Sequence, residues 1–161
     1  MTALKTAFFV LLVPGFLLGV VPVLLIPKIG GLAFAPGWDS WLALPFWVAG
    51  TAFIIWCATD FVRKGGGTPV PLDPPKELVV GGLYRYVRNP MYIGALLIQV
   101  GNAVWFGSLA QVVYLFFLFI GFTLFIRANE EPYLRKTFGA AYEEYCRKVP
   151  RWLPRITAPR R

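Results

Sequence analysis

The sequence predicts an all-α integral membrane protein with four transmembrane helices, a cytoplasmic loop and a C-terminal amphipathic helix. Three observations predict this fold class. Of the 161 residues, 57% are hydrophobic and only 15% are charged, which is unlike a soluble domain. Four apolar runs approach or exceed the roughly 20 residues that a bilayer crossing needs. Almost all lysines and arginines fall on one side of the membrane if those four runs are the spans.

The four predicted spans belong to a single membrane domain that covers residues 1–161. The spans are residues 4–26, 41–62, 91–106 and 109–126. Pro22 in the first span is compatible with a membrane helix, because neighbouring helices can satisfy the carbonyls that a proline frees. The last two spans are joined at Gly107-Ser108 and are short, so we expect them to tilt or to extend into their flanks.

The positions of the basic residues predict the orientation. Lys28 is the only basic residue between the first two spans, and the other fifteen of the 16 are Lys5 at the start of the first span and those in the 63–90 loop and the tail 127–161. The positive-inside rule therefore places both termini and the 63–90 loop in the cytoplasm. A cleaved signal peptide is disfavoured, because the first apolar run is too long and no A-x-A site follows it.

The tail after the fourth span has a helical pattern of its own. Asn129 followed by Glu130 and Glu131 is typical of a helix N-terminus, where a capping side chain and acidic residues are favoured. Apolar or aromatic residues then recur near helical spacing at Leu134, Phe138, Tyr142 and Tyr145. We therefore expect an amphipathic helix, kinked or broken at Gly139, that lies on the membrane surface or folds back over the helix ends.

Several classes of function are excluded by what the sequence lacks. There is no histidine, so there is no histidine base, no histidine metal ligand and no Ser-His-Asp triad. Cys57 and Cys146 are far apart and form neither a zinc motif nor a disulfide framework, and we predict no metal site. No Rossmann or P-loop nucleotide motif is present. The basic residues follow topology rather than one groove, which argues against a nucleic-acid partner.

Three features are candidates for chemistry. Around Arg88, a glycine- and aromatic-rich segment precedes the third span, with Asn89 as the expected helix cap and Pro90 as its first residue. Free backbone N–H groups there would favour an anion, although an aromatic belt with snorkelling arginines fits equally well. Glu130-Glu131 are either ordinary helix-start acids or acceptors for ligand hydroxyl or ammonium groups. Gln99 and Asn102 either bond to another helix or line a cavity.

Two separated motifs give the chain a resemblance to a known family. The first has the form G-x-Y-x-x-x-R-H-P-x-Y-x-G and is matched by Gly82, Tyr84, Arg88, Asn89, Pro90, Tyr92 and Gly94. The second, an E-E-x-x-L pattern that ends in V-P, is matched by Glu130, Glu131, Leu134, Phe138, Gly139, Tyr142, Tyr145, Val149 and Pro150. In order and spacing they resemble the isoprenylcysteine carboxyl methyltransferase and phospholipid methyltransferase superfamily of integral membrane enzymes.

The resemblance implies a methyltransferase that uses S-adenosyl-L-methionine, with the amphipathic tail helix covering the cofactor pocket. The positions that would contact the cofactor are Leu78, Val79, Tyr84, Asn89, Pro90, Met91, Tyr92 and Glu130. The expected catalytic residues are Arg88, Arg127 and Glu131. A lipophilic small-molecule or prenylated acceptor would enter sideways from the lipid bilayer, and its reacting group is expected to be a carboxylate.

Two departures from the family pattern bear on this expectation. The motif histidine is Asn89, which cannot titrate, and the arginine that serves the acceptor carboxylate in the carboxyl methyltransferases is replaced by Ile126, with Arg127 one residue later. Three other functions therefore remain open. They are a phospholipid N-methyltransferase, with Glu131 or a tyrosine as a proton relay, an NADPH-dependent sterol-type reductase of related fold, and a non-catalytic membrane scaffold.

Overall fold

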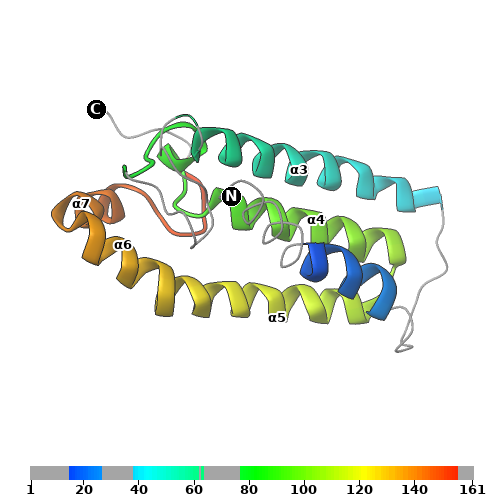
Figure 1. Cartoon of the computed structure of the whole chain (residues 1–161). Coiled ribbons are helices and arrows are strands. Elements are labelled where there is room, and N and C mark those ends of the chain that lie inside the picture. Colours follow the sequence, from blue (N-terminus) through cyan, green and yellow to red (C-terminus); the bar gives the residue numbers. More distant parts are fainter. Residues whose placement is uncertain (1–14, 27–37, 62, 64–76, 156–161) are drawn as a thin grey trace, which may run out of the picture.

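The computed structural model describes residues 15–26, 38–61, 63 and 77–155, and within those residues it contains helices and no strands. The elements are η1 (Phe16–Leu25), η2 (Trp38–Leu42), α3 (Ala43–Asp60), η4 (Gly82–Arg85), α4 (Pro90–Phe106), α5 (Leu109–Phe125), η5 (Ile126–Glu130), α6 (Glu131–Phe138) and α7 (Ala140–Lys148) (Figure 1). Here η1 and η5 are π-helical, and η2 and η4 are 3₁₀ helices. The predicted all-helical class is confirmed.

The apolar helices follow the predicted spans closely. Two helical stretches, Asp39–Asp60 and Leu109–Phe138, are long and apolar enough to cross a membrane. Phe16–Leu25 and Pro90–Phe106 are apolar but shorter. The first predicted span lies partly outside the described residues, so the four-span arrangement stays a prediction.

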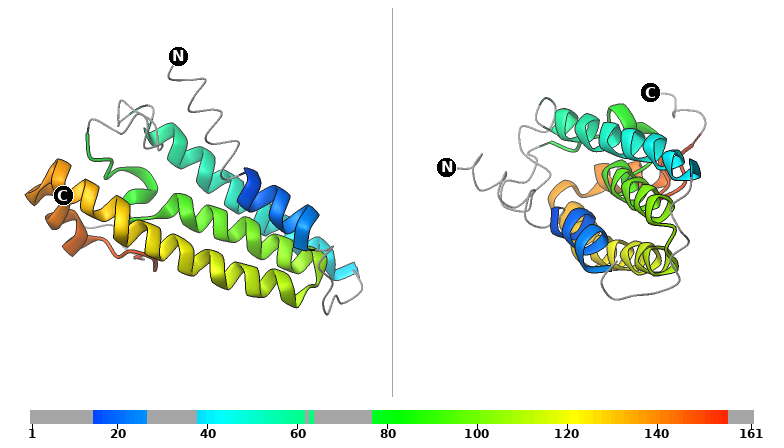
Figure 2. Two further views of the ribbon diagram at one scale, coloured as in Figure 1. Left: turned by 60° about the horizontal axis from the view of Figure 1, so that its bottom comes forward. Right: turned by 90° about the vertical axis from the view of Figure 1, so that its right-hand side faces the viewer.

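Helix α4 is the centre of the bundle, with α3 on one side, α5 on another and η1 against it (Figures 1 and 2). Glycines allow α3 and α4 to approach closely. A Cβ atom on Gly50 would lie 2.5 Å from the carbonyl oxygen of Gly94, and one on Gly101 would lie 2.6 Å from Nε1 of Trp47. Small residues at helix crossings are typical of membrane bundles, in which packing replaces the hydrophobic effect.

Three buried amides, Gln99, Asn102 and Gln111, form what we call the amide cluster. Nε2 of Gln99 donates to Oε1 of Gln111 (2.7 Å), and Nδ2 of Asn102 donates to Oε1 of Gln99 (3.1 Å). Trp47 donates its indole N–H to Oδ1 of Asn102 (3.1 Å), and Nε2 of Gln111 donates to the carbonyl of Pro22. Of the two alternatives that the sequence left open for Gln99 and Asn102, the structure shows the hydrogen bonds to other helices.

Pro22 explains part of this polar arrangement inside an apolar bundle. Because proline has no N–H, it cannot bond to the carbonyls four and five residues earlier, which belong to Leu18 and Leu17. Those two carbonyls accept hydrogen bonds from Nδ2 of Asn102 (3.3 Å) and the hydroxyl of Tyr114 (2.8 Å). Side chains of α4 and α5 thus satisfy backbone groups that η1 cannot satisfy itself.

The fourth apolar helix continues into the tail. Helices α5, η5 and α6 form one stretch from Leu109 to Phe138, so the helix start that we predicted at Asn129 is wrong. Nδ2 of Asn129 instead bonds back to the carbonyl of Phe125 (3.3 Å). The helix keeps helical backbone angles through the π-helical turn, so no free N–H groups are left there for Asn129 to cap. The predicted break at Gly139 is confirmed, and its φ of 52° is one that glycine adopts readily.

The apolar residues of the tail face one cluster. Buried Tyr142, Tyr145 and Val149 pack with Leu78, Leu134, Phe138 and Cys146. The hydroxyl of Tyr145 also donates to the carbonyl of Tyr84 (2.8 Å), which joins α7 to η4. The expected single tail helix is therefore two short helices that pack against the segment preceding α4.

Candidate functional site

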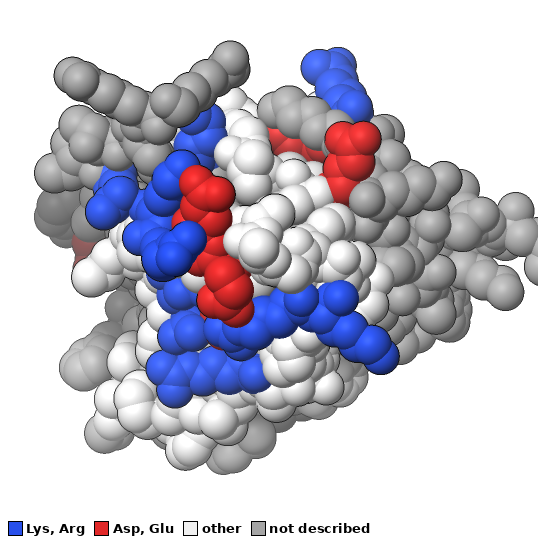
Figure 3. Space-filling model, turned by 90° about the vertical axis from the view of Figure 1, so that its left-hand side faces the viewer, with Lys and Arg blue, Asp and Glu red and all other residues white. Residues whose placement is uncertain are grey.

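The two sequence motifs meet at one end of the bundle, beside α6 and α7. Tyr92, in the first turn of α4, donates its hydroxyl to the carboxylate of Glu130, which lies 38 residues later. Nη1 of Arg88 lies 3.2 Å from Oε1 of Glu131, 43 residues later. From this end, Lys and Arg side chains lie beside a group of Asp and Glu side chains (Figure 3). The fold therefore brings together residues that the two motifs supply separately.

The start of α4 sets the positions of the first motif. Pro90 is the first helical residue, as predicted, and Asn89 occupies the cap position. The side chain of Asn89 does not cap the helix, and its Nδ2 donates to the carbonyl of Arg151 (3.2 Å). The capping expectation is therefore right about the position and wrong about the hydrogen bond. The amide of Asn89 attaches the motif to the tail.

Arg88, Glu131 and Arg151 form what we call the charged cluster. Arg151 binds Glu131 through two atoms, with Nε at 2.7 Å from Oε1 and Nη2 at 3.1 Å from Oε2. Arg135 adds a contact of 3.5 Å to Oε2. The Glu131 side chain is only 5% exposed. Two-point arginine–carboxylate contacts are strong and directional, so this cluster fixes the tail against the start of α4.

The pKa values of the two adjacent glutamates are shifted in opposite directions. Both residues lie after residues 109–126, the predicted fourth span, and so outside the predicted membrane-spanning segment. Burial alone would raise the pKa of Glu131, but the hydrogen bond from Arg151 and the charges of Arg151, Arg88 and Arg135 lower it below its ordinary value. Burial raises the pKa of Glu130, with the Tyr92 hydrogen bond opposing and the charge of Glu131 adding to the rise. Two adjacent carboxyl groups whose pKa values shift in opposite directions are suited to different roles.

Glu130 differs from Glu131 in its partners. Within residues 77–155 the partner of Glu130 is the neutral hydroxyl of Tyr92, and no cation pairs with it. The ring of Tyr92 packs edge-on against Phe122, with ring centroids 4.8 Å apart. Glu130 is thus a half-buried carboxylate that could accept further hydrogen bonds or bind a cation.

The other predicted cofactor residues lie in the segment before α4 and at its start. Val79 and Tyr84 are buried with Cys57, and Met91 packs against that group. Leu78 packs instead against the tail cluster of Tyr142, Tyr145 and Val149. Residues 77–90 therefore connect α3 to the tail helices, and six of the predicted cofactor positions lie within or next to this connection.

Arg127 is the predicted site residue that takes no part in the contacts between the two motifs. It is exposed and makes no ion pair with a described residue. Ile126, which occupies the family's arginine position, is buried at 1% exposure. The π-helical turn alters the helix here without bringing Arg127 inward.

Two tail residues belong to this region although the sequence did not single them out. Arg151 forms the charged cluster, and the ring of Trp152 packs on Phe119 of α5 with centroids 5.0 Å apart. Main-chain bonds hold this segment, from the N–H of Arg88 to the carbonyl of Pro150 (2.9 Å) and from the N–H of Arg155 to the carbonyl of Tyr86 (3.0 Å). The sequence feature that could have identified these two residues is their position, because Arg151 and Trp152 directly follow the V-P that ends the second motif.

Comparisons with known proteins agree with the motifs. Residues 38–141 match the family described as phospholipid methyltransferase. A protein-S-isoprenylcysteine O-methyltransferase of Schizosaccharomyces pombe is 36% identical over 81 residues, which cover 49% of this chain and 34% of the relative. A probable protein-S-isoprenylcysteine O-methyltransferase of Oryza sativa subsp. indica is 40% identical over 81 residues, which cover 50% of this chain and 42% of the relative.

A more distant similarity reaches a second class of enzyme. A Delta(14)-sterol reductase of Gallus gallus is 29% identical over 82 residues, which cover 50% of this chain and 13% of the relative. The chain thus spans well under half the length of these curated relatives. No solved structure matches.

Proposed function

The chain belongs to the phospholipid methyltransferase family, and from this premise we propose that it is a membrane enzyme that transfers a methyl group from S-adenosyl-L-methionine to a lipophilic acceptor. The observation that carries the proposal is the meeting of the two motifs through Tyr92–Glu130 and Arg88–Glu131. These contacts join residues far apart in sequence at the end of the bundle where the charged side chains gather.

The residues present fit this cofactor. S-adenosyl-L-methionine carries a sulfonium and an ammonium group, and bound there it would supply an activated methyl group. Glu130 is a half-buried carboxylate without a cationic partner among the described residues, so it can accept from an ammonium or a hydroxyl group. We propose that the cofactor is held by Leu78, Val79, Tyr84, Asn89, Pro90, Met91, Tyr92 and Glu130.

A carboxylate is the acceptor that this site favours. Such an acceptor needs no base, so the protein has only to align the reactants, exclude water and balance charge, which a chain without histidine can do. Arg88 and Glu131 bind each other, and we propose that they position the start of α4. Arg127 is exposed and would attract an anionic acceptor through its charge. The names of the relatives from Schizosaccharomyces pombe and Oryza sativa agree with this acceptor class.

We further propose that this domain has four spans, with both termini and the 63–90 loop in the cytoplasm. The long apolar helices Asp39–Asp60 and Leu109–Phe138 and the distribution of basic residues support this arrangement. The polar cofactor would then enter from the cytoplasm, and a lipophilic or prenylated acceptor from the bilayer. The tail helices α6 and α7 would cover the cofactor.

Two other functions have specific support. The family description favours a phospholipid N-methyltransferase, but the lowered pKa of Glu131 makes that carboxylate a poor proton acceptor for an amine. The similarity to a sterol reductase favours a nicotinamide cofactor. Titrating the purified protein in lipid nanodiscs separately with S-adenosyl-L-methionine and with NADPH distinguishes the methyltransferases from the reductase. Binding of NADPH alone would contradict our proposal.

Glu130→Gln tests the cofactor assignment. We expect the variant to fold normally and to bind S-adenosyl-L-methionine about ten- to a hundredfold more weakly, because a charged hydrogen-bond acceptor is lost. Since the pKa of Glu130 is raised, wild-type affinity should fall on acidification from a pH above the ordinary glutamate value, and the variant should lose this dependence. Calorimetric titration from pH 4 to 8 measures both, and unchanged affinity would contradict the assignment.

Glu143→Gln is the matched control for this measurement. Glu143 lies in α7, is 53% exposed in its side chain and pairs with Arg135. Its replacement removes the same charge from the same end of the bundle without touching the Tyr92–Glu130 pair. We expect its cofactor affinity and pH dependence to match those of the wild type.

A further inference from the structure

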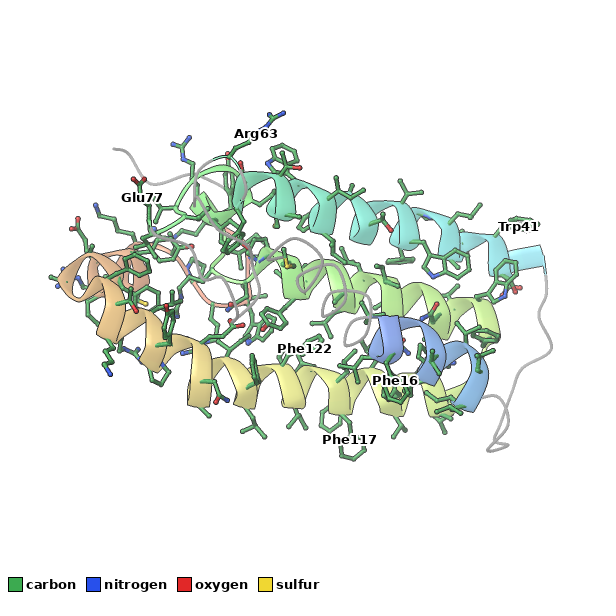
Figure 4. All side chains as sticks on the ribbon, viewed as in Figure 1. Phe16, Trp41, Arg63, Glu77, Phe117 and Phe122 are labelled. Atoms are coloured by element: carbon green, nitrogen blue, oxygen red, sulfur yellow. The ribbon has the colours of Figure 1, made fainter. Side chains whose placement is uncertain are left out.

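Trp152 is a tail residue that packs against the apolar part of α5. Its ring packs on Phe119, which lies three residues before Phe122 and therefore on the same side of the helix. Phe122 packs on Tyr92, the residue that bonds to Glu130. Side chains of α5 point both into the bundle, as Phe122 does, and away from it, as Phe117 does (Figure 4). Trp152 thus stands at the end of an aromatic row that leads to the proposed cofactor carboxylate.

The position of Trp152 along the helix separates it from the polar end of the site. Phe119 lies seven residues before Ile126, where the predicted span ends, which corresponds to about 10 Å along a helix axis. A polar cofactor that enters from the cytoplasm meets Glu130 first. A lipophilic acceptor that enters from the bilayer would approach at the level of Phe119. Trp152 therefore lies on the acceptor side.

Hydrogen bonds fix the chain on both sides of Trp152. Arg151 binds Glu131 with its side chain and accepts from Asn89 with its carbonyl. On the other side, the N–H of Arg155 donates to the carbonyl of Tyr86. The indole is thus placed by its neighbours and is preorganised to meet a ligand.

The indole N–H of Trp152 is buried and has no hydrogen-bond partner among the described residues, and the same is true of Nε of Arg88. A buried donor without an acceptor is costly, and the indole N–H can only donate. Packing on Phe119 alone would need a ring but no donor. Arg88 and Arg151, the residue before Trp152, both bind the carboxylate of Glu131, so the two unpaired donors belong to chain segments that this carboxylate joins. Both lack an acceptor.

We propose that Trp152 recognises the acceptor, by donating its indole N–H to an oxygen of the carboxylate group of a lipophilic acceptor. This inference rests on the proposed methyltransferase function and assigns the acceptor side of the same site. The ring packs on Phe119 beside the acceptor's apolar chain, and the N–H selects for an oxygen-bearing head. Specificity thus comes from a tail residue rather than from the helix that carries Arg127.

Trp152→Phe removes the N–H and keeps an aromatic ring on Phe119. With an N-acylated S-prenylcysteine carboxylate as the probe, we expect the acceptor KM to rise about tenfold or more, the usual effect of losing a hydrogen bond to a charged group. The Kd of S-adenosyl-L-methionine should stay unchanged. Trp41→Phe is the control, because Trp41 is 63% exposed at the opposite end of the bundle (Figure 4). An unchanged acceptor KM, or an equal loss of cofactor affinity, would overturn the proposal.

A spectroscopic measurement gives a second readout that does not depend on turnover. In protein labelled with ¹⁵N-tryptophan, the indole signal that is absent from Trp152→Phe belongs to Trp152, and the carboxylate probe should move it downfield. A signal that does not move, or a wild-type protein that does not bind the probe, overturns the inference. If that same wild-type protein binds S-adenosyl-L-methionine, the methyltransferase proposal still stands, so the two failures are distinguishable.

Discussion

The amide cluster and the charged cluster are both buried and polar, but they lie toward opposite ends of α4 and differ in how their groups are paired. In the amide cluster, Gln99 and Gln111 are fully buried, and they bond to each other and to the backbone of η1. In the charged cluster, Glu131 joins the first motif to the tail. The amide cluster satisfies the carbonyl of Leu18, which Pro22 leaves free, and the carbonyl of Pro22 itself. The charged cluster instead connects the two segments that carry the family motifs.

The difference teaches how to distinguish a structural polar group from a functional one inside an apolar bundle. No buried polar atom of the amide cluster lacks a partner, because an unpaired amide in a bundle core would be costly. At the charged end, Nε of Arg88 and Nε1 of Trp152 have no hydrogen-bond partner, and Glu130 has no cationic partner, among the residues that the structure describes. Incomplete pairing, rather than burial of polar groups, therefore distinguishes the end at which we propose that ligands bind.

Breaking the charged cluster should have the largest effect. Glu131→Gln leaves Arg88 and Arg151 without their carboxylate, and we expect a loss of about 3 kcal/mol in the free energy of unfolding. Because the pKa of Glu131 lies below its ordinary value of 4.5, its stabilisation is present above that pH and is lost as the pH falls through the lower folded value. Denaturant unfolding in nanodiscs between pH 3 and 7 measures this. A variant as stable as the wild type at pH 7 would show that the cluster does not hold the tail.

Breaking the amide cluster should have a smaller effect. Gln111→Leu removes the acceptor of Gln99 and the donor to Pro22, and we expect a loss of about 1–2 kcal/mol with no change in cofactor affinity. The double variant Gln99→Leu/Gln111→Leu should lose less than the sum of the two single variants, since their shared bond is counted in each. Weaker cofactor binding in Gln111→Leu would contradict the view that the amide cluster is structural and that only the charged end binds the cofactor.

Arg127→Ala should have the smallest effect and sharpens the comparison. Arg127 is charged and near the cluster in sequence but is exposed, so its loss should change the free energy of unfolding by less than about 0.5 kcal/mol. We expect the acceptor KM to rise about two- to threefold at low salt and to match the wild type at high salt, because exposed charges act at long range and are screened. A KM that does not change at either salt concentration would remove Arg127 from the site.

The prediction from sequence was accurate where a local pattern carries the information. Pro90 starts α4 and Gly139 separates α6 from α7, and both follow from the conformations that proline and glycine favour. The predicted cap at Asn129 failed because capping requires a helix to begin there, and α5 continues through the turn. A capping pattern is a signal of sequence alone and does not reveal whether an upstream helix has ended.

The sequence by itself determined the helical class, the apolar helices and the two motifs, since helical period, proline and glycine act over a few residues. Only the tertiary structure decided that Asn89 bonds to the tail, that Glu131 pairs with Arg88 and Arg151, and that Arg127 stays outside. Such pairings join residues distant in the chain, and burial makes their charges and hydrogen bonds strong. Which partners meet therefore depends on how the helices pack, which no local pattern contains.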